Sequence, residues 1–368
     1  MYFLREGLFE CCSSASFGKP EFLSKEKLIS ARPGTSLAPS STGNLDLYYQ
    51  RWQSDRRQQV RAVVFVHSGE TDHAAWYNAL AVRLAAAGCV TVALDPQGFG
   101  QSDGARGYFE SFQEVVDDFV CFVKAKWTEM SSQQGFPATL IVVAKGLGAL
   151  VAMSALPELR AMALESGTVP ALALLSPGFQ FARFISDQSG VSCGLNSAQC
   201  ARQPLAQCAR APIAFTPTGE TQKLEYLSRW FPKMIVTQPV DPDLVCRDPQ
   251  AVERMARDHL IWRQGYRARV LSEIVEAQNR LLQSIEQHGE DFQCPALILH
   301  GSGDKLYSVQ GSIGIHSAWC QGVESEATAL VPRLKIYDGA YHQLLNEPNK
   351  DEVMNDIVNF ALSSLTGY

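Results

Sequence analysis

The sequence lacks the features that mark several large classes of protein. Lys and Arg together number 32 against 38 Asp and Glu, so the formal net charge is -6 and no basic excess exists for nucleic-acid phosphates. We find no apolar stretch long enough to span a bilayer. The chain also does not open with the charged segment, apolar run and small-residue cleavage site of a secretory signal. We therefore expect neither nucleic-acid binding, nor a membrane span, nor secretion.

Metal-ligand spacing is also lacking. The ten cysteines are scattered, and the closest group, Cys193, Cys200 and Cys208, has no neighbouring histidine. Zinc sites and disulfide frameworks need paired or regularly spaced ligands, which are missing here. We interpret the cysteines as reduced thiols of a cytoplasmic protein, and we expect no metal and no cofactor.

Hydrophobic residues make up 46% of the chain, which is enough for a large buried core. Residues 1–42 differ from the rest, because they are rich in serine and show no sustained periodicity. We interpret them as a disordered leader. An organelle address is an alternative that four acidic residues disfavour: Glu6, Glu10, Glu21 and Glu26. Acylation of Cys11 and Cys12 is a second alternative, with no membrane helix nearby to support it.

Beyond the leader, strand and helix patterns alternate along the chain. The run 45–49 alternates like a half-buried edge strand, and continuous apolar runs follow at 62–66, 90–94, 140–143, 171–175 and 296–299. Strands apolar on both faces belong in the middle of a parallel sheet. Helical patterns lie between them, at 75–87, 112–127 and 147–156. This order predicts an α/β fold with a mostly parallel central sheet flanked by helices.

The alternation stops after residue 176 and resumes near 293. The segment 177–292 is irregular and rich in proline in its first half and helical in its second, at about 248–288. We interpret it as a helical cap inserted into a core formed by residues 43–176 and 293–368. Ligands of such sheets bind at the carboxyl ends of the strands, so the residues that follow each strand are the candidates for function.

Three of these strand ends carry a recognisable pattern. The 140s strand runs into Val143-Ala144-Lys145-Gly146-Leu147-Gly148, a small-residue turn that opens a helix. The 290s strand is followed by Asp304 in a glycine-rich loop, and a strand at 333–337 is followed by His342 before the last helix, at about 351–362. Small residues, then Asp, then His, each just past a strand, follow the order of an α/β-hydrolase site, in which G-x-S-x-G carries the nucleophilic serine.

Further stretches resemble monoacylglycerol-lipase-like hydrolases, of the serine aminopeptidase S33 and lysophospholipase-like group. Asp95-Pro96-Gln97-Gly98-Phe99-Gly100-Gln101-Ser102-Asp103-Gly104 is similar to their D-x-x-G-H-G-x-S-x-G stretch. Gly339-Ala340-Tyr341-His342 and Leu345-Asn346-Glu347-Pro348 are similar to their histidine loop, and Asp248-Pro249 with the following helices to their cap. The resemblance covers about 45–365. It implies an α/β-hydrolase fold and a helical cap over an acyl-chain pocket.

The resemblance also implies roles for individual residues. Asp304 and His342 would be the acid and base of a catalytic triad, and Gly146 stands where the nucleophilic serine belongs. The family turn H-G-x-G matches His67-Ser68-Gly69-Glu70, so the oxyanion donors would be the backbone amides of Gly69 and Leu147. Ser68 replaces a family glycine, and it would distort the turn if that position needs a positive φ.

Because the nucleophile's oxygen is missing, we expect a catalytically degenerate hydrolase that keeps a pocket for an acyl ester or glycerolipid. Two alternatives stay open: hydrolysis by water that His342 and Asp304 activate, or an active enzyme with another nucleophile, for which Ser68 is the best candidate. Whether Gly146 is natural or engineered is also open. Ser102 also lies in a G-x-S-x-G pattern, but no strand–turn–helix surrounds it, so we interpret it as a loop residue.

Two further side-chain groups have both structural and functional interpretations. Lys145, beside the turn, is expected to be an exposed or paired charge and not an amine nucleophile. The cap aromatics Phe179, Phe181 and Phe184, with Ile185, are expected to pack over the sheet, with peripheral membrane contact as the alternative. Trp230 and Phe231 fit either interpretation, and the nearby Lys223, Arg229 and Lys233 are too few to argue attachment to anionic lipid.

Overall fold

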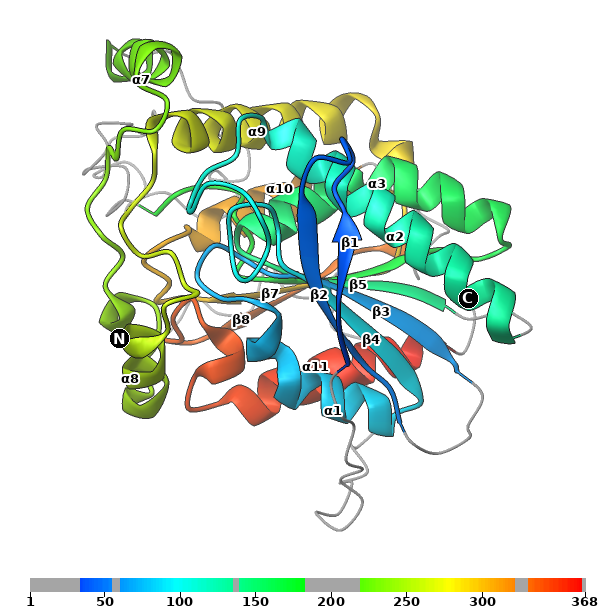
Figure 1. Cartoon of the computed structure of the whole chain (residues 1–368). Helices are drawn as coiled ribbons and strands as arrows, with labels where there is room; N and C mark the ends of the chain where they lie inside the picture. Colours follow the sequence, from blue (N-terminus) through cyan, green and yellow to red (C-terminus); the bar gives the residue numbers. More distant parts are fainter. Residues whose placement is uncertain (1–33, 55–59, 135–138, 183–218, 322–329, 366–368) are drawn as a thin grey trace.

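A computed structural model describes residues 34–54, 60–134, 139–182, 219–321 and 330–365. In this part of the chain, eight strands form one sheet in the order β1-β2-β4-β3-β5-β6-β7-β8. Strands β3 to β8 run parallel to one another, whereas β2 is antiparallel to both β1 and β4. Helices cover the two faces of the sheet (Figure 1). The predicted fold, a mostly parallel sheet flanked by helices, is confirmed.

The antiparallel edge begins earlier in the chain than the sequence predicted. Strand β1, Gly34–Pro39, pairs with β2, Asp46–Trp52, and lies inside the segment interpreted as a leader. The boundary at residue 42 is therefore too late, since residues 34–39 already belong to the sheet. Residues 1–33, with Cys11 and Cys12, lie outside the described residues.

The parallel strands coincide with the apolar runs. They are β3 (Ala62–His67), β4 (Cys89–Leu94), β5 (Thr139–Lys145), β6 (Ala171–Leu175), β7 (Ala296–Gly301) and β8 (Arg333–Tyr337). Every residue of β3, β4, β6 and β7 is buried, because helices cover both faces there. Because both faces are buried, these strands appear in the sequence as unbroken hydrophobic runs.

The core helices divide between the two faces (Figure 1). Helices α1 (Asn78–Ala86) and α11 (Lys350–Ser363) share one hydrophobic cluster with the sheet. Helices α2 (Phe112–Gln134) and α3 (Leu147–Glu165) pack against the other face. Helix α3 continues past Pro157, whereas the sequence pattern predicted its end at residue 156. Helix α10 (Val309–Gln321) was not predicted.

One helix in the described part of the chain is long and apolar enough to cross a membrane by length and composition. This is α3, with a mean hydropathy of 1.4, so the expectation that no stretch reaches that length is wrong by this criterion. The helix packs against the sheet and alongside α2, and 61% of its apolar stretch is buried inside the protein. Burial of α3 against the sheet and α2 accounts for its hydrophobicity.

The inserted segment contributes helices beside the carboxyl ends of the strands. In its described part lie α7 (Gly219–Trp230), α8 (Pro249–Arg257) and α9 (Ala268–Gln287), with a short 3-10 turn at Pro242–Leu244. Helix α9 contacts α2, α3 and α7, which joins the insertion to the core. Phe179 and Phe181 are buried, as their packing interpretation predicted. Residues 183–218, with Phe184, Ile185, Cys193, Cys200 and Cys208, lie outside the described residues.

Candidate active site

The turn between β5 and α3 has the shape of a nucleophile elbow, and Gly146 is at its tip. Its backbone has φ 55° and ψ -124°, a conformation that costs a residue with a side chain about 1–3 kcal/mol but is open to glycine. Gly148 is needed for close packing, since a Cβ there would lie 2.6 Å from the carbonyl oxygen of Ser68. The strand–turn–helix therefore accommodates a glycine at its tip, where the resemblance predicts a nucleophile.

The carboxylate of Glu70 lies beside this tip. A Cβ built on Gly146 would be 2.8 Å from Glu70 Oε2 and 3.3 Å from His342 Nε2, so both side chains face the place of a nucleophile's side chain. The backbone N–H of Leu147, the first residue of α3, donates to Glu70 Oε2 at 3.0 Å. A carboxylate is favoured at this position, because the free amides and the dipole at a helix N-terminus attract negative charge.

Two tyrosines enclose the other side of the same carboxylate. The hydroxyl of Tyr266 donates to Glu70 Oε1 at 3.0 Å and lies 3.4 Å from the hydroxyl of Tyr307. Burial, and after it the charge of Glu70, raises the pKa of both phenols well above the ordinary value. Both tyrosines therefore stay protonated at neutral pH. The sequence patterns did not single out Glu70, Tyr266 or Tyr307.

Asp304 and His342 form a buried pair. His342 Nδ1 lies 2.9 Å from Asp304 Oδ2, and His300 Nε2 lies 3.3 Å from the same oxygen. The other oxygen of Asp304 accepts from the backbone amides of Leu306 and Tyr307. Since Nδ1 donates to the carboxylate, Nε2 of a neutral His342 is a hydrogen-bond acceptor. It is buried and has no partner in the part of the chain that the structure describes.

Burial alone would raise the pKa of Asp304, but the two histidines outweigh it and hold the pKa well below its usual range. A carboxyl with a lowered folded-state pKa stabilises the fold above its unfolded pKa, about 3.9, and loses that contribution as the pH falls further. We expect Asp304→Asn to lower the free energy of unfolding by about 1–3 kcal/mol at pH 7. The difference from the parent should shrink steadily below pH 4. Urea denaturation at pH 7, 4 and 3 measures it, and a pH-independent difference would contradict this account.

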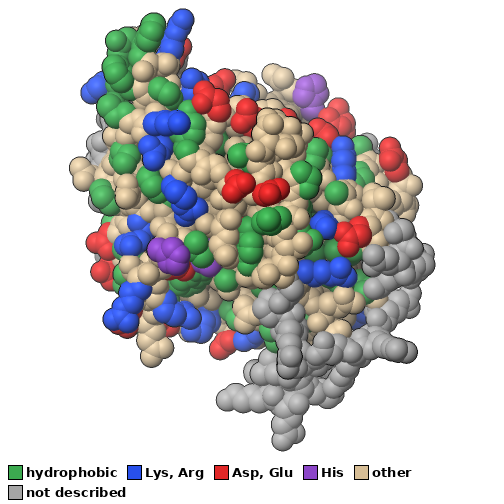
Figure 2. Space-filling model, viewed as in Figure 1, with side chains coloured by type: hydrophobic (Ala, Val, Ile, Leu, Met, Phe, Trp, Pro, Cys, Tyr) green, Lys and Arg blue, Asp and Glu red, His purple; other side chains and the backbone are tan. Residues whose placement is uncertain are grey.

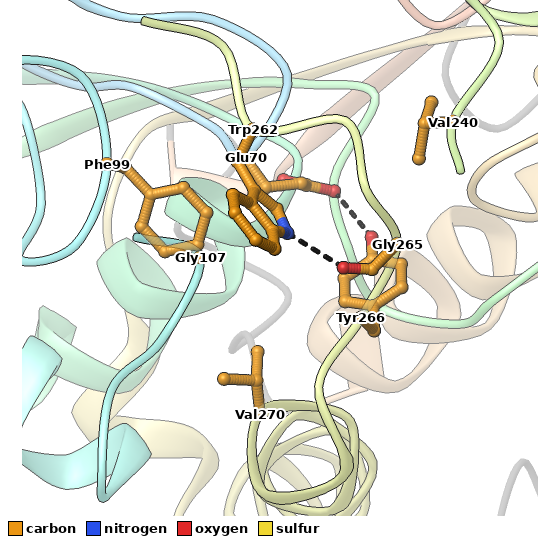
Figure 3. A pocket seen from close by; sticks show the side chains of 8 residues that line it. All are labelled: Glu70, Phe99, Gly107, Val240, Trp262, Gly265, Tyr266 and Val270. Atoms are coloured by element: carbon orange, nitrogen blue, oxygen red, sulfur yellow. Dashed lines mark hydrogen bonds between the residues drawn. The ribbon is translucent and has the colours of Figure 1, made fainter. Parts of the chain in front are cut away.

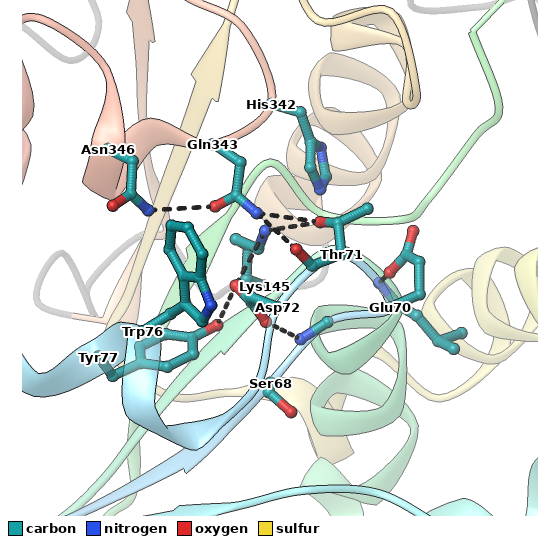
Figure 4. A network of polar contacts seen from close by, with 12 residues as sticks. Ser68, Glu70, Thr71, Asp72, Trp76, Tyr77, Lys145, His342, Gln343 and Asn346 are labelled. Atoms are coloured by element: carbon teal, nitrogen blue, oxygen red, sulfur yellow. Dashed lines mark hydrogen bonds and ion pairs between the residues drawn. The ribbon is translucent and has the colours of Figure 1, made fainter. Parts of the chain in front are cut away.

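A buried polar network holds the loop that carries Glu70 (Figure 4). Lys145 is fully buried, and its Nζ lies 3.0 Å from Asp72 Oδ2 and 2.9 Å from Thr71 Oγ1. Tyr77 donates to the same Asp72 oxygen, and the amide of Gln343 donates to the carbonyl oxygen and the hydroxyl of Thr71. Lys145 is therefore a paired charge, as expected, although it is not exposed. It ties the loop after β3 to the end of β5.

The two predicted oxyanion donors are placed differently. Leu147 N–H points at the candidate site, where Glu70 already bonds to it. Gly69 N–H donates to Asp72 Oδ1 at 2.8 Å, so it could serve an oxyanion only if Asp72 released it. Both roles, with those of Gly146, Asp304 and His342, stay predictions. The structure brings these five residues to one end of the sheet.

The candidate serines do not reach the histidine. Ser68 Oγ donates to the carbonyl of Leu94, on the side away from His342 (Figure 4). Ser68 does not have a positive φ, so the expected distortion of its turn is not seen; among the described residues only one non-glycine, Ser176, has a positive φ, of 40°. Ser102 Oγ donates to the carbonyl of Asp95, which fits its interpretation as a loop residue.

A small pocket opens beside Glu70 (Figure 3). The space it encloses holds about one water molecule, and the remainder is open to solvent. It lies between the core and the insertion, and its lining is mostly apolar and aromatic: Glu70, Phe99, Gly107, Val240, Trp262, Gly265, Tyr266 and Val270. Glu70 is the one charged residue in this lining. Among the described residues we find no group of three or more His, Cys, Asp or Glu arranged to hold a metal ion.

The sheet order, the elbow, and the Asp–His pair define an α/β-hydrolase. Residues 58–349 match the family model of serine aminopeptidase, S33. The chain belongs to this family, and within it the chain is a monoacylglycerol lipase-like α/β-hydrolase.

Relatives of known identity agree with this assignment. The chain is 26% identical to a monoacylglycerol lipase of Mycolicibacterium smegmatis, over 89% of this chain and 96% of that one. It is 25% identical to a human monoglyceride lipase, over 83% of this chain and 84% of that one. The solved structure of a soluble variant of monoglyceride lipase from Saccharomyces cerevisiae, in complex with a substrate analogue, superposes with a TM-score of 0.66 at 14% identity and covers 92% of this chain and 97% of that one.

Proposed function

We propose that this chain is a catalytically degenerate monoacylglycerol lipase-like protein that binds an acyl or glycerolipid ligand without hydrolysing it at a lipase rate. Gly146 at the elbow carries this proposal, because acyl transfer by this fold needs a nucleophilic oxygen at that position. The apolar pocket beside the elbow supports a binding role. The lipases among its relatives support a lipid as the ligand class.

A residual hydrolase is the second candidate. The buried, unpartnered Nε2 of His342 favours it, because such an acceptor can take a proton from a water that attacks an ester. In a well-studied serine protease, about 10³–10⁴-fold acceleration remains without the triad. Residual hydrolysis could also use another serine as the nucleophile in place of position 146. Ser176, at the end of β6, is buried, has a positive φ, and has no partner for its hydroxyl among the described residues.

Hydrolysis of a monoacylglycerol and of a short acyl ester tests these alternatives. We expect no turnover above background for the parent chain, and no covalent labelling by a fluorophosphonate, which reacts with activated serines. A non-hydrolysable monoacylglycerol ether should still bind, as measured by titration calorimetry. Binding should weaken about tenfold or more when Trp262→Ala opens the pocket wall. Exposed Trp230→Ala is the matched control for loss of an indole.

Each alternative has its own signature in the same assay. Turnover that disappears in His342→Ala and persists in Ser68→Ala and Ser176→Ala would establish water activated by the histidine. Fluorophosphonate labelling that disappears in Ser176→Ala would identify a substitute nucleophile. Either result would overturn the proposal that the protein is catalytically degenerate. Failure of the ether to bind would overturn the proposed binding role.

Contact of the insertion with a membrane stays a proposal. Its support is a group of exposed apolar side chains on α7 and the segment that follows: Tyr226, Trp230, Phe231, Met234 and Ile235. Figure 2 shows hydrophobic and basic side chains together at the tip of the molecule that carries α7 (Figures 1 and 2). Co-sedimentation of the same preparations with phosphatidylcholine vesicles measures it, and an unbound parent chain would refute it.

A further inference from the structure

We infer that Glu70 sets the ligand specificity of the pocket: it selects uncharged acyl lipids whose head group carries hydroxyl donors, and it rejects fatty acid anions. The inference rests on the proposed binding function and adds the residue that discriminates between ligands. Its central observation is that a carboxylate of the protein itself occupies the anion-binding position at the start of α3.

The position of Glu70 leaves no place for a second anion. Its Oε2 receives the N–H of Leu147, which in a working hydrolase of this fold faces the substrate's oxygen. Gly69 N–H, the other predicted donor, is bonded to Asp72. Among the described residues no Lys, Arg or His forms an ion pair with Glu70, and the buried Lys145 of the same loop is paired with Asp72. A fatty acid carboxylate entering here would meet a like charge at short range in a low-dielectric pocket.

Acceptors dominate the remaining polar surface. The carboxylate of Glu70 can accept further hydrogen bonds, and His342 Nε2 is an acceptor with no partner among the described residues. Both lie within about 3.3 Å of the point where a Cβ on Gly146 would stand. The hydroxyl of Tyr266 is already donated to Glu70. A head group that brings its own O–H donors satisfies this arrangement, whereas a bare carboxylate has none to offer.

The walls have the apolar character of the remainder of such a ligand, and the space between them has to widen to admit a chain. Phe99, Trp262, Val240 and Val270 line the pocket with apolar surface next to Glu70 (Figure 3). The indole N–H of Trp262 is bonded to the carbonyl of Gly265, so it does not add a donor to the pocket. An acyl or alkyl chain would lie against these side chains, with its hydroxylated end toward Glu70 and His342.

Titration calorimetry at pH 8 with two ligands of equal chain length tests the inference. Glycerol 1-decyl ether is uncharged and cannot be hydrolysed, and decanoate is fully ionised at this pH. We expect the parent to bind the ether at least about tenfold more tightly than decanoate. Glu70→Gln, which keeps the size and removes the charge, should tighten decanoate binding at least about tenfold, whereas the ether loses a carboxylate acceptor and should bind no more tightly than to the parent.

Two controls separate this effect from general loss of charge or of fold. Glu276→Gln removes one exposed negative charge on α9 and should leave both affinities as in the parent. Thermal unfolding of Glu70→Gln checks that the variant is folded, and Tyr266→Phe, which keeps the charge of Glu70, should retain the preference for the ether.

The outcomes distinguish failure of this inference from failure of the proposed function. Equal binding of the two ligands by the parent, or an unchanged preference in folded Glu70→Gln, would overturn the role of Glu70 while leaving lipid binding intact. Binding of neither ligand by the parent would overturn both.

Discussion

Gly146→Ser alone is expected to restore little esterase activity, whereas Gly146→Ser combined with Glu70→Ala should be at least about 10²-fold more active than the single variant. The introduced Cβ would lie 2.8 Å from Glu70 Oε2, closer than real Cβ contacts, so the carboxylate has to move. It also holds the N–H of Leu147, a donor the reaction needs. Loss of one oxyanion donor costs about 10²–10³-fold in turnover in a related chemistry.

Hydrolysis of a short acyl ester, together with fluorophosphonate labelling at position 146, measures this effect. Glu70→Ala by itself is the control and should stay at background, because it creates no nucleophile. A strained φ of 55° should make Gly146→Ser less stable than the parent by about 1–3 kcal/mol, so assays belong well below the unfolding temperature. If the single variant equals the double, the carboxylate swings away easily and does not block the site.

The double variant also tests whether the other predicted catalytic residues are correctly placed. Activity in the double variant requires that Asp304 and His342 remain aligned, as their 2.9 Å contact indicates. It also tests whether one free donor, Leu147 N–H, suffices while Gly69 N–H stays with Asp72. Inactive but labelled protein would point to the missing second donor.

The parallel strands could be predicted because of where they lie. A strand covered by helices on both faces has to be apolar along its whole length, so β3, β4, β6 and β7 stand out as runs. The edge strand β1 is neither covered on both faces nor apolar along its whole length. It contains Pro39, exposes Leu37 and is paired on one side only. Helix α3 passes Pro157 because packing of its buried residues outweighs the lost backbone hydrogen bond.

The site was predictable only as far as local patterns describe it. Gly146, Asp304 and His342 each follow a strand, so their meeting at one end of the sheet follows from the fold. The position of Glu70 depends on how the loop after β3 folds toward the start of α3, a contact between residues 77 positions apart. Its signal in the sequence was a carboxylate at the last glycine of the H-G-x-G match. Tyr266 comes from the part of the insertion predicted as helical, about 248–288, but it lies in the irregular segment between α8 and α9, which the helical pattern does not place.

Lys145→Met is expected to be the most destabilising single substitution in this network, lowering the free energy of unfolding by about 3–5 kcal/mol. Lys145 Nζ and the Asp72 carboxylate are 3.0 Å apart, and their side chains are 0% and 3% exposed. Removing one partner of a buried pair leaves the other charge buried without compensation, which costs far more than the pair itself contributes. The change also removes the donor to Thr71 Oγ1.

Lys124→Met is the matched control, since Lys124 pairs with Glu158 at the same 3.0 Å but on the surface, with side chains 47% and 58% exposed. Exposed pairs contribute about 0–1 kcal/mol, so this variant should unfold close to the parent in urea. Equal destabilisation by the two variants would mean that Asp72 finds other partners or water once Lys145 is removed. The expected contrast would instead establish Lys145 as the anchor of the loop that places Glu70. In that case Lys145 stabilises the loop that places Glu70, and Gly146 leaves room for the carboxylate, since a Cβ at position 146 would lie 2.8 Å from Glu70 Oε2.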